Sequence, residues 1–249
     1  MLIIKTSSYE IAANLTGHED ADRLAILMPG RLDTKDYINF KVHADLLSDL
    51  GFIVVAIDPP GTWESPGSLE NYTTSMYVDC INELIEHFGN KPTLLLGHSR
   101  GGATAMIASA NPHVSAIVCI NAAYGNPSAP DPEKIVDGAL PESRDLPPGD
   151  TRTVEQVKIN LPLAYFEDGK KHNPAKSLAD FKGPKLIVHA TEDEFKPLAE
   201  VKELFKELDD PKMFLEIDCK HDYRLYPEVM DQVNVMLSTF VEECLVQES

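Results

Sequence analysis

Short apolar runs alternate along the chain with stretches of helical periodicity. The runs cover residues 24–28, 52–57, 93–96, 116–120 and 186–189. Because they are nearly continuous in apolar residues, they are typical of strands buried on both faces of a parallel sheet. Helical patterns lie between and after them, at about residues 36–50, 72–89, 100–111, 197–208 and 227–245. The alternation predicts an α/β fold with a mostly parallel sheet and helices on both of its faces.

The two ends of the chain complete the predicted sheet, which then has about eight strands. Residues 2–6 and 9–15 predict an antiparallel hairpin, and residues 213–217 predict a late strand. The last helix has apolar residues at i, i+3, i+4 and i+7 spacing, namely Val229, Met230, Val233, Met236, Leu237, Phe240 and Val241. We interpret this stripe as the face that packs on the core, with a partner-binding face as the alternative.

Residues 122–182 interrupt the alternation with prolines and clusters of charge, and we expect one helix near 152–167. A structureless stretch of this length is uncommon inside a compact domain. Leu163, Tyr165 and Phe166 also argue against a disordered loop, which is the alternative. We therefore expect a small cap or lid inserted after the sixth strand. The core would consist of residues 1–121 and 183–249.

The clearest chemical signal is Gly97-His98-Ser99-Arg100-Gly101, which follows the apolar run directly and is itself followed by small residues. This is the sequence form of a nucleophile elbow, in which a serine stands on a sharp turn between a strand and a helix. Side chains two residues on either side of the serine would collide with the neighbouring strand and helix, which explains the glycines. The pattern predicts Ser99 as a nucleophile, and a glycine-rich turn with a bystander serine is the alternative.

A serine nucleophile needs a base, and that base needs a third group to orient it. Asp193 lies in the loop after the strand at 186–189, although Glu192 and Glu194 are its neighbours and the choice among the three acids stays open. His221 is the candidate base, because it lies in a loop between a late strand and the last helix. The chain order serine, acid, histidine is the one that accompanies an elbow serine.

An oxyanion hole would complete this chemistry. One donor should be the backbone N–H of Arg100, directly after the serine. The second should come from the loop after the strand at 24–28, where Gly30 allows a close approach. There the N–H of Arg31 is the first candidate and that of Leu32 the second. Trp63, in the loop after the fourth strand, is a candidate pocket residue together with Gly30 and Leu32; a plain loop anchor is the alternative reading for Trp63.

With these residues the chain resembles the α/β-hydrolase superfamily, in particular its small serine carboxylesterase and lipase-like members. The resemblance covers about 23–121 and 183–245. It implies the α/β-hydrolase fold and a triad of Ser99, Asp193 and His221. Because the elbow residue is serine rather than aspartate or cysteine, the resemblance does not imply a dehalogenase, an epoxide hydrolase or a dienelactone hydrolase. The segment between the two matching parts carries no signature of the family.

The charge composition narrows the classes of binding partner that this chain can have. With 22 Lys and Arg against 40 Asp and Glu, the formal net charge is -18. This excess argues against nucleic acids and anionic membranes, both of which require basic surfaces. We expect a cytoplasmic protein, since no apolar run is long enough to span a membrane and no signal peptide is visible. The four cysteines form no metal-binding pattern, so we expect neither a metal nor a cofactor.

The sequence thus predicts an esterase that acts on a small-molecule ester through an acyl-enzyme, with its oligomeric state left open. A C–C bond hydrolase, a thioesterase or an acyltransferase could use the same residues, because a fold does not choose among these reactions. A non-catalytic binding protein of the same fold is a more remote alternative.

Overall fold

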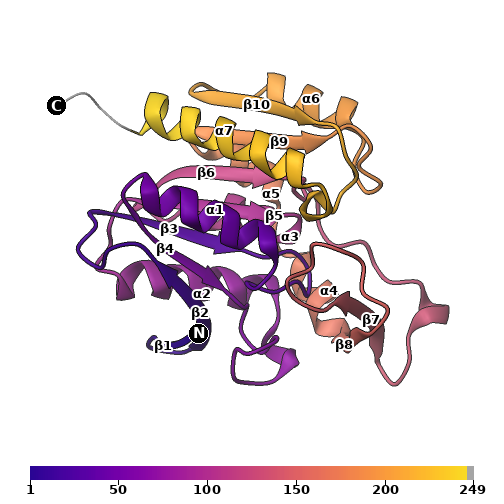
Figure 1. Cartoon of the computed structure of the whole chain (residues 1–249). Coiled ribbons are helices and arrows are strands. Elements are labelled where there is room, and N and C mark those ends of the chain that lie inside the picture. Colours follow the sequence, from indigo (N-terminus) through magenta and orange to yellow (C-terminus); the bar gives the residue numbers. More distant parts are fainter. Residues whose placement is uncertain (246–249) are drawn as a thin grey trace.

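The central feature of the computed structural model, which describes residues 1–245, is one sheet of eight strands (Figure 1). The strands are β1 (Leu2–Lys5), β2 (Glu10–Thr16), β3 (Arg23–Met28), β4 (Phe52–Ile57), β5 (Thr93–His98), β6 (Val114–Ile120), β9 (Lys185–Ala190) and β10 (Lys212–Ile217). Their order across the sheet is β1-β2-β4-β3-β5-β6-β9-β10. Strand β2 runs opposite to the other seven strands, which are all parallel to one another. The predicted α/β architecture, including the lead-in hairpin, is confirmed.

Helices cover both faces of the sheet (Figure 1). One face carries α1 (Ile38–Asp49) and α7 (Pro227–Cys244). The other face carries α2 (Thr74–His87), α3 (Arg100–Ala108), α5 (Pro174–Asp180) and α6 (Leu198–Lys206). Short 3-10 helices lie at Leu69–Asn71, Pro132–Lys134 and Tyr223–Leu225. The apolar stripe of α7 packs against the sheet, which confirms its interpretation as a core-facing surface.

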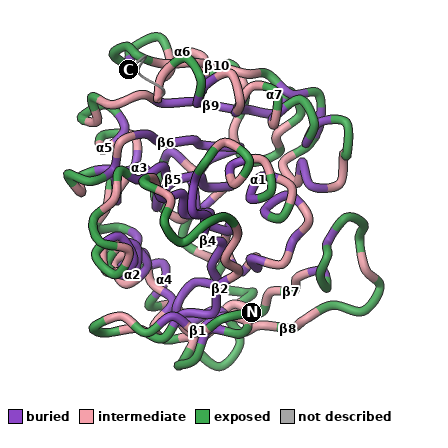
Figure 2. The backbone as a smooth tube through the Cα atoms, turned by 60° about the vertical axis from the view of Figure 1, so that its left-hand side comes forward, coloured by how far each residue is buried: buried purple, intermediate pink, exposed green. Residues whose placement is uncertain are grey.

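Burial explains why the sequence predicted these strands so closely. Every residue of β4, β5 and β9 is buried, and Figure 2 shows these strands as purple segments within the molecule. A strand covered by helices on both faces can use apolar side chains at every position. The continuous apolar runs therefore mark the centre of the sheet.

The chain between β6 and β9 adds a second, two-stranded antiparallel sheet of β7 (Ala139–Asp145) and β8 (Gln156–Pro162) (Figure 1). Helix α4 (Leu163–Gly169) follows β8 directly. The helix that we expected near 152–167 is therefore wrong over most of its length. Apolar and polar residues alternate along β8 with the period of two that suits a half-buried strand, and this short pattern was overlooked.

This inserted segment packs on the main core as well as on itself. Tyr165 and Phe166 of α4 and Leu178 of α5 are all buried in the same hydrophobic cluster as α2 and α3. The hairpin β7–β8 projects farther from the sheet (Figure 1). The segment thus combines a projecting hairpin with two helices, α4 and α5, that pack on the face of the sheet that carries α2 and α3.

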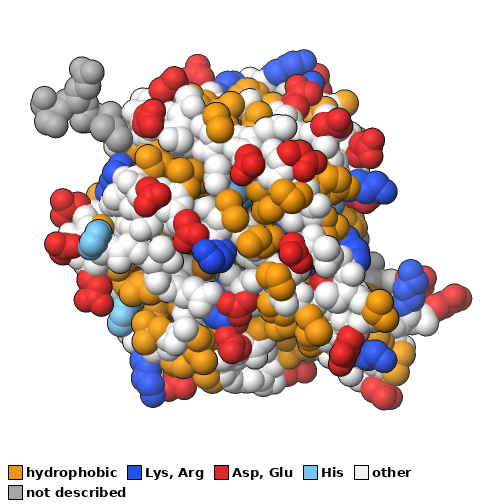
Figure 3. All heavy atoms as spheres, viewed as in Figure 1, with side chains coloured by type: hydrophobic (Ala, Val, Ile, Leu, Met, Phe, Trp, Pro, Cys, Tyr) orange, Lys and Arg blue, Asp and Glu red, His pale blue; other side chains and the backbone are white. Residues whose placement is uncertain are grey.

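The surface carries mixed charges. On the face shown in Figure 3, basic side chains are scattered singly among acidic ones and form no broad basic area. No helix within residues 1–245 combines the length and the apolar character needed to cross a bilayer. The cysteines are free thiols, of which Cys80, Cys119 and Cys219 are buried.

Glycines allow α3 to pack unusually close to the sheet. A Cβ on Gly97 of β5 would lie 2.2 Å from the carbonyl carbon of Gly101, and a Cβ on Gly101 would lie 2.1 Å from the carbonyl oxygen of Met28. Both distances are far shorter than a van der Waals contact, and both neighbours are backbone atoms that cannot rotate away. The collisions expected from the sequence, with the helix on one side and a strand on the other, are therefore confirmed.

Gly101→Ala should destabilise the fold by about 3 kcal/mol or more, because the new methyl group must push α3 away from β3. Gly125→Ala is a matched control, since its Cβ would meet no atom within 4 Å and its φ is not positive. We expect the control to change the free energy of unfolding by no more than about 0.5 kcal/mol. Urea unfolding of both variants measures this difference, and equal midpoints would contradict the prediction.

Candidate active site

Ser99 lies on the turn between β5 and α3 with a strained backbone, at φ 52° and ψ −115°. Such a positive φ is rare for a residue with a Cβ. The turn is held by its own backbone groups: the Ser99 N–H donates to the carbonyl of Ile120 (2.9 Å), and the Ser99 carbonyl accepts from the N–H groups of Gly102 (3.1 Å) and Ala123 (3.0 Å). The sequence pattern of an elbow thus corresponds to an elbow in the structure.

His221 and Asp193 meet Ser99 at the carboxyl edge of the sheet. His221 Nε2 lies 2.9 Å from Ser99 Oγ, and His221 Nδ1 lies 2.7 Å from Asp193 Oδ2. Asp193 comes from the loop after β9 and His221 from the loop after β10, and these strands are parallel neighbours. The three side chains named from the sequence are therefore brought together in one hydrogen-bonded line.

The structure distinguishes the three neighbouring acids. Only Asp193, whose side chain is almost fully buried, faces the imidazole of His221. Its Oδ1 accepts the N–H groups of Phe195 (2.8 Å) and Lys196 (3.0 Å). Glu194 instead accepts the backbone N–H of His221 at 3.0 Å, and Glu192 is exposed. Burial of Asp193 disfavours its charged form, but the hydrogen bond and charge of His221 outweigh burial and lower the pKa of this carboxyl.

Of the three backbone N–H groups proposed as oxyanion donors, two lack acceptors among residues 1–245. One belongs to Arg100 at the first turn of α3, where helix geometry leaves such donors free. The other belongs to Arg31. The N–H of Leu32, our second choice, is instead occupied by the Tyr72 hydroxyl at 3.1 Å. Gly30 lies so close to the serine that a Cβ there would come within 3.2 Å of Ser99 Cβ.

Trp63 and Leu32 do not line the site, contrary to the expectation that they would form part of the pocket. The indole N–H of Trp63 donates to the carbonyl of Leu32 at 2.8 Å. Trp63 therefore helps to hold the loop after β3. Leu32 has a φ of 61° and is fully buried in the core. Because this backbone turn directs its side chain inward, Leu32 serves packing.

A cavity of about 1030 Å³ opens over Ser99. Aromatic and aliphatic lining comes from Tyr124, Tyr165, Phe195 and Leu204. Phe195 is 75% exposed and meets the His221 ring edge-on, with ring centroids 4.6 Å apart. Charged residues also line the cavity, and they include Arg31, which was expected near the site. The lining of the cavity therefore combines apolar, charged and uncharged polar residues with the serine.

The charged lining depends on inserted residues that the sequence analysis missed. Arg144 and Asp145 lie at the end of β7 and line the cavity. Asp145 is paired with Arg224 at 2.6 Å and with Arg152 at 3.0 Å. No motif marks these residues, because Arg31 and Arg224, which they contact, lie 113 and 79 positions away in the sequence.

His98, the elbow residue directly before Ser99, lies between two acceptor groups. Its Nδ1 is 3.6 Å from Asp33 Oδ2, and its Nε2 is 3.2 Å from the carbonyl oxygen of His221. The Nε2 contact is within hydrogen-bond distance, whereas the longer Nδ1 contact places the ring next to a carboxylate without a direct hydrogen bond. Burial of His98 alone would lower its pKa, but the interaction with the Asp33 carboxylate outweighs burial and raises it.

One acidic cluster has the spacing of a metal site. Asp36, Asp58 and Glu64 have oxygens within 4.8 Å of one another. The buried ammonium of Lys35 lies among them, 2.7 Å from Asp36, 3.2 Å from Asp58 and 2.5 Å from Glu64. Lysine thus supplies the positive charge in this cluster, which is not part of the cavity over Ser99.

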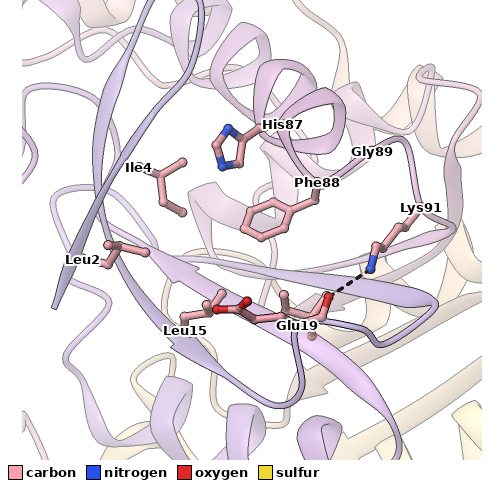
Figure 4. A pocket seen from close by; sticks show the side chains of 9 residues that line it. Leu2, Ile4, Leu15, Glu19, His87, Phe88, Gly89 and Lys91 are labelled. Carbon is pink, nitrogen blue, oxygen red and sulfur yellow. Dashed lines mark hydrogen bonds between the residues drawn. The ribbon is translucent and has the colours of Figure 1, made fainter.

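A second pocket, of about 500 Å³, lies at the edge of the sheet where the parallel strands β4 and β5 begin (Figure 4). Its wall is mainly apolar, with Leu2, Ile4, Leu15 and Phe88 around it, while Lys91 donates to the carbonyl of Glu19 at its rim. Ligands of open α/β sheets bind at the opposite, carboxyl edge. The cavity over Ser99 is therefore the candidate active site.

Comparison with known proteins agrees with this fold. Residues 26–161, more than half of the chain, match the sequence profile described as the alpha/beta hydrolase fold. The chain belongs to the α/β hydrolase fold family, as the resemblance implied. No curated protein sequence matches it.

Solved structures of this family superpose over nearly the whole chain. Est1E from Butyrivibrio proteoclasticus with bound ferulic acid has a TM-score of 0.77 at 18% identity, covering 99% of this chain and 100% of that one. A monoacylglycerol lipase from Paleococcus ferrophilus has a TM-score of 0.71 at 20% identity, covering 94% and 99%. The thioesterase domain of the curacin biosynthetic pathway has a TM-score of 0.71 at 12% identity, covering 95% and 98%. At such identities the likeness concerns the fold.

The paired state of His98 makes a prediction for stability. Its pKa is raised in the folded state above the ordinary 6.5, so protonation stabilises the fold. This contribution is fully present below about pH 6.5 and is lost as the pH rises through the raised pKa. Compared with His98→Gln, which cannot titrate, the wild type should therefore lose stability as the pH rises from 6 to 9. Urea unfolding across this range measures the difference, and parallel profiles would rule out a charged His98.

Proposed function

We propose that this protein is a serine hydrolase that cleaves small or medium acyl esters through an acyl-enzyme. The observation that carries the proposal is the hydrogen-bonded line from Ser99 to His221 (2.9 Å) and from His221 to Asp193 (2.7 Å). Distances of 2.6–3.2 Å between nucleophile, base and orienting group characterise an activated serine. The strained turn adds support, because it presents the hydroxyl above the sheet.

In the proposed reaction, Ser99 Oγ bonds to the acyl carbonyl carbon while its proton moves to His221 Nε2. The N–H groups of Arg100 and Arg31 stabilise the resulting oxyanion, and the amino end of α3 adds its dipole. The C–O bond of the ester then breaks, and His221 returns the proton to the leaving alcohol. Water hydrolyses the acyl-enzyme by the same steps in reverse order. Asp193 accepts the Nδ1 proton throughout and stabilises the imidazolium.

The cavity supports a small-molecule substrate. Its volume of about 1030 Å³ is at the upper end of the range for small-molecule sites. The exposed Phe195 and the neighbouring Leu204 offer an apolar surface for an acyl or alkyl group. We propose that residues 122–182 act as the cap, since they supply much of the cavity wall, including Tyr124, Arg144 and Tyr165. No metal or cofactor enters this proposal.

Thioester hydrolysis, C–C bond hydrolysis and acyl transfer remain the competing reactions. Each would use the same serine, and thioesterase domains share the fold. A panel of p-nitrophenyl butyrate, a butyryl thioester, a vinylogous 1,5-diketone and an added alcohol acceptor separates them by kcat/KM. Fluorophosphonate labelling of Ser99 separates all of them from a non-catalytic binding protein.

Ser99→Ala should reduce kcat for p-nitrophenyl butyrate by about 10⁴-fold or more, since it removes the attacking oxygen. It should also abolish fluorophosphonate labelling, while the fold is retained because alanine occupies little space. Stopped-flow or plate-based release of p-nitrophenol measures the rate. A variant that hydrolyses the ester as fast as the wild type would end the proposal.

Asp193→Asn should reduce kcat by about 10⁴-fold, because an amide can hold His221 in the wrong tautomer. Glu194→Gln is the matched control on the next residue. It touches the His221 backbone rather than the ring, so we expect a loss below about 10-fold, as befits one supporting hydrogen bond. Steady-state kinetics measure kcat for both variants. Equal losses of kcat would show that Asp193 does not orient His221.

A further inference from the structure

We propose that Arg144, on the inserted strand β7, is a positioning residue that fixes the Arg31 N–H in the oxyanion hole. The inference rests on the proposed function and deepens it. It concerns a residue 113 positions away from the loop that it contacts. The inserted segment would then influence the reaction rate through Arg144, in addition to lining the cavity.

The first observation is a fork of hydrogen bonds. Arg144 Nε and Nη2 both donate to the carbonyl oxygen of Arg31, at 2.9 Å and 2.6 Å. The guanidinium also lies 3.4 Å from Asp33 Oδ1 and 3.1 Å from Glu142 Oε2. Its side chain is only 17% exposed, so these charge-assisted bonds are poorly screened by water. Arg144 is thus held firmly and holds the Arg31 carbonyl in turn.

The second observation is that both peptide groups around Arg31 are restrained. The carbonyl of Gly30 accepts the N–H of Asp33 at 3.2 Å. Because a peptide is planar and trans, the Arg31 N–H on the other side of that bond must point the opposite way. The next peptide is held by Arg144 at its carbonyl and by the Tyr72 hydroxyl at the Leu32 N–H, 3.1 Å away.

The third observation is what would happen without this fork. Leu32 has a φ of 61°, so the loop leaves the ordinary backbone regions directly after Arg31. A strained turn persists only where its surroundings hold it in place. Without Arg144, the Arg31 carbonyl would lose both donors, and the peptide after Arg31 would keep only its bond to Tyr72. Because that peptide shares the Arg31 Cα with the peptide that carries the free N–H, a rotation of the first can turn the second. Since an oxyanion donor must be directed at the developing charge, such a rotation would affect the transition state more than substrate binding.

Arg144→Gln tests the proposal, with Lys158→Gln as the control for charge removal in the same hairpin. Lys158 lies on β8 opposite Ser143, is exposed and does not line the cavity. We expect Arg144→Gln to lower kcat for p-nitrophenyl butyrate by about 10- to 100-fold, below the loss for deleting a whole donor. KM should change less than about 3-fold. Affinity for a trifluoromethyl ketone, which forms an oxyanion on Ser99, should fall in parallel with kcat.

Arg144→Lys provides the conservative variant, because one ammonium can replace part of the fork. It should recover some of the lost kcat and ketone affinity, and it decides the question if Arg144→Gln does not fold. Unchanged kcat in the folded Arg144 variants would overturn the inference. It would also be overturned if these variants lost affinity for the substrate and for the trifluoromethyl ketone to the same extent. Those results would leave the proposed function standing if the wild type is active and labelled at Ser99. A wild type that hydrolyses no ester would overturn both.

Discussion

The backbone of Ser99 is the constraint on which the rest of the site depends. A non-glycine residue at φ 52° costs on the order of 1–3 kcal/mol and must be stabilised by its surroundings. The stabilisation comes from the tight approach of α3 to β3 and β5, which Gly97 and Gly101 permit at backbone distance. The same approach leaves the Arg100 N–H free beside the serine. The close packing of α3 thus holds the strained turn together with its backbone hydrogen bonds, while the start of the helix provides the free donor.

Buried charges around the site hold loops in place. Asp33 lies between His98 of the elbow and Arg144 of the hairpin, and its pKa is lowered because these cationic neighbours outweigh the effect of burial. Breaking such a pair would strand the remaining charge in a poorly solvated place, which commonly costs 3–5 kcal/mol. The cavity wall is therefore charged but internally paired, in a chain whose net charge is -18.

Sequence reasoning succeeded where one physical demand shapes a local pattern. Strands buried on both faces require continuous apolar runs, and the elbow requires glycines at fixed spacing, so Ser99 could be found directly. Chain order pointed to His221 and to the loop of Asp193, where the choice among three neighbouring acids needed the structure. Reasoning failed at β8, whose half-buried alternation is short, and at Trp63, which holds the Leu32 carbonyl instead of lining the cavity. It could not find Arg144, because no local pattern records a contact across 113 residues.

The end of β7 shows how the inserted segment is joined to the loops of the main sheet. Successive side chains of a strand point to opposite sides. Arg144 accordingly reaches the loop after β3, while Asp145 reaches Arg224, which follows the loop that carries His221. Two adjacent residues thus hold the proposed oxyanion loop and the histidine loop at once. Because the same strand lines the cavity, a change in the inserted segment alters the substrate wall and the reacting groups together. Under the proposed function, specificity and rate are therefore coupled through β7.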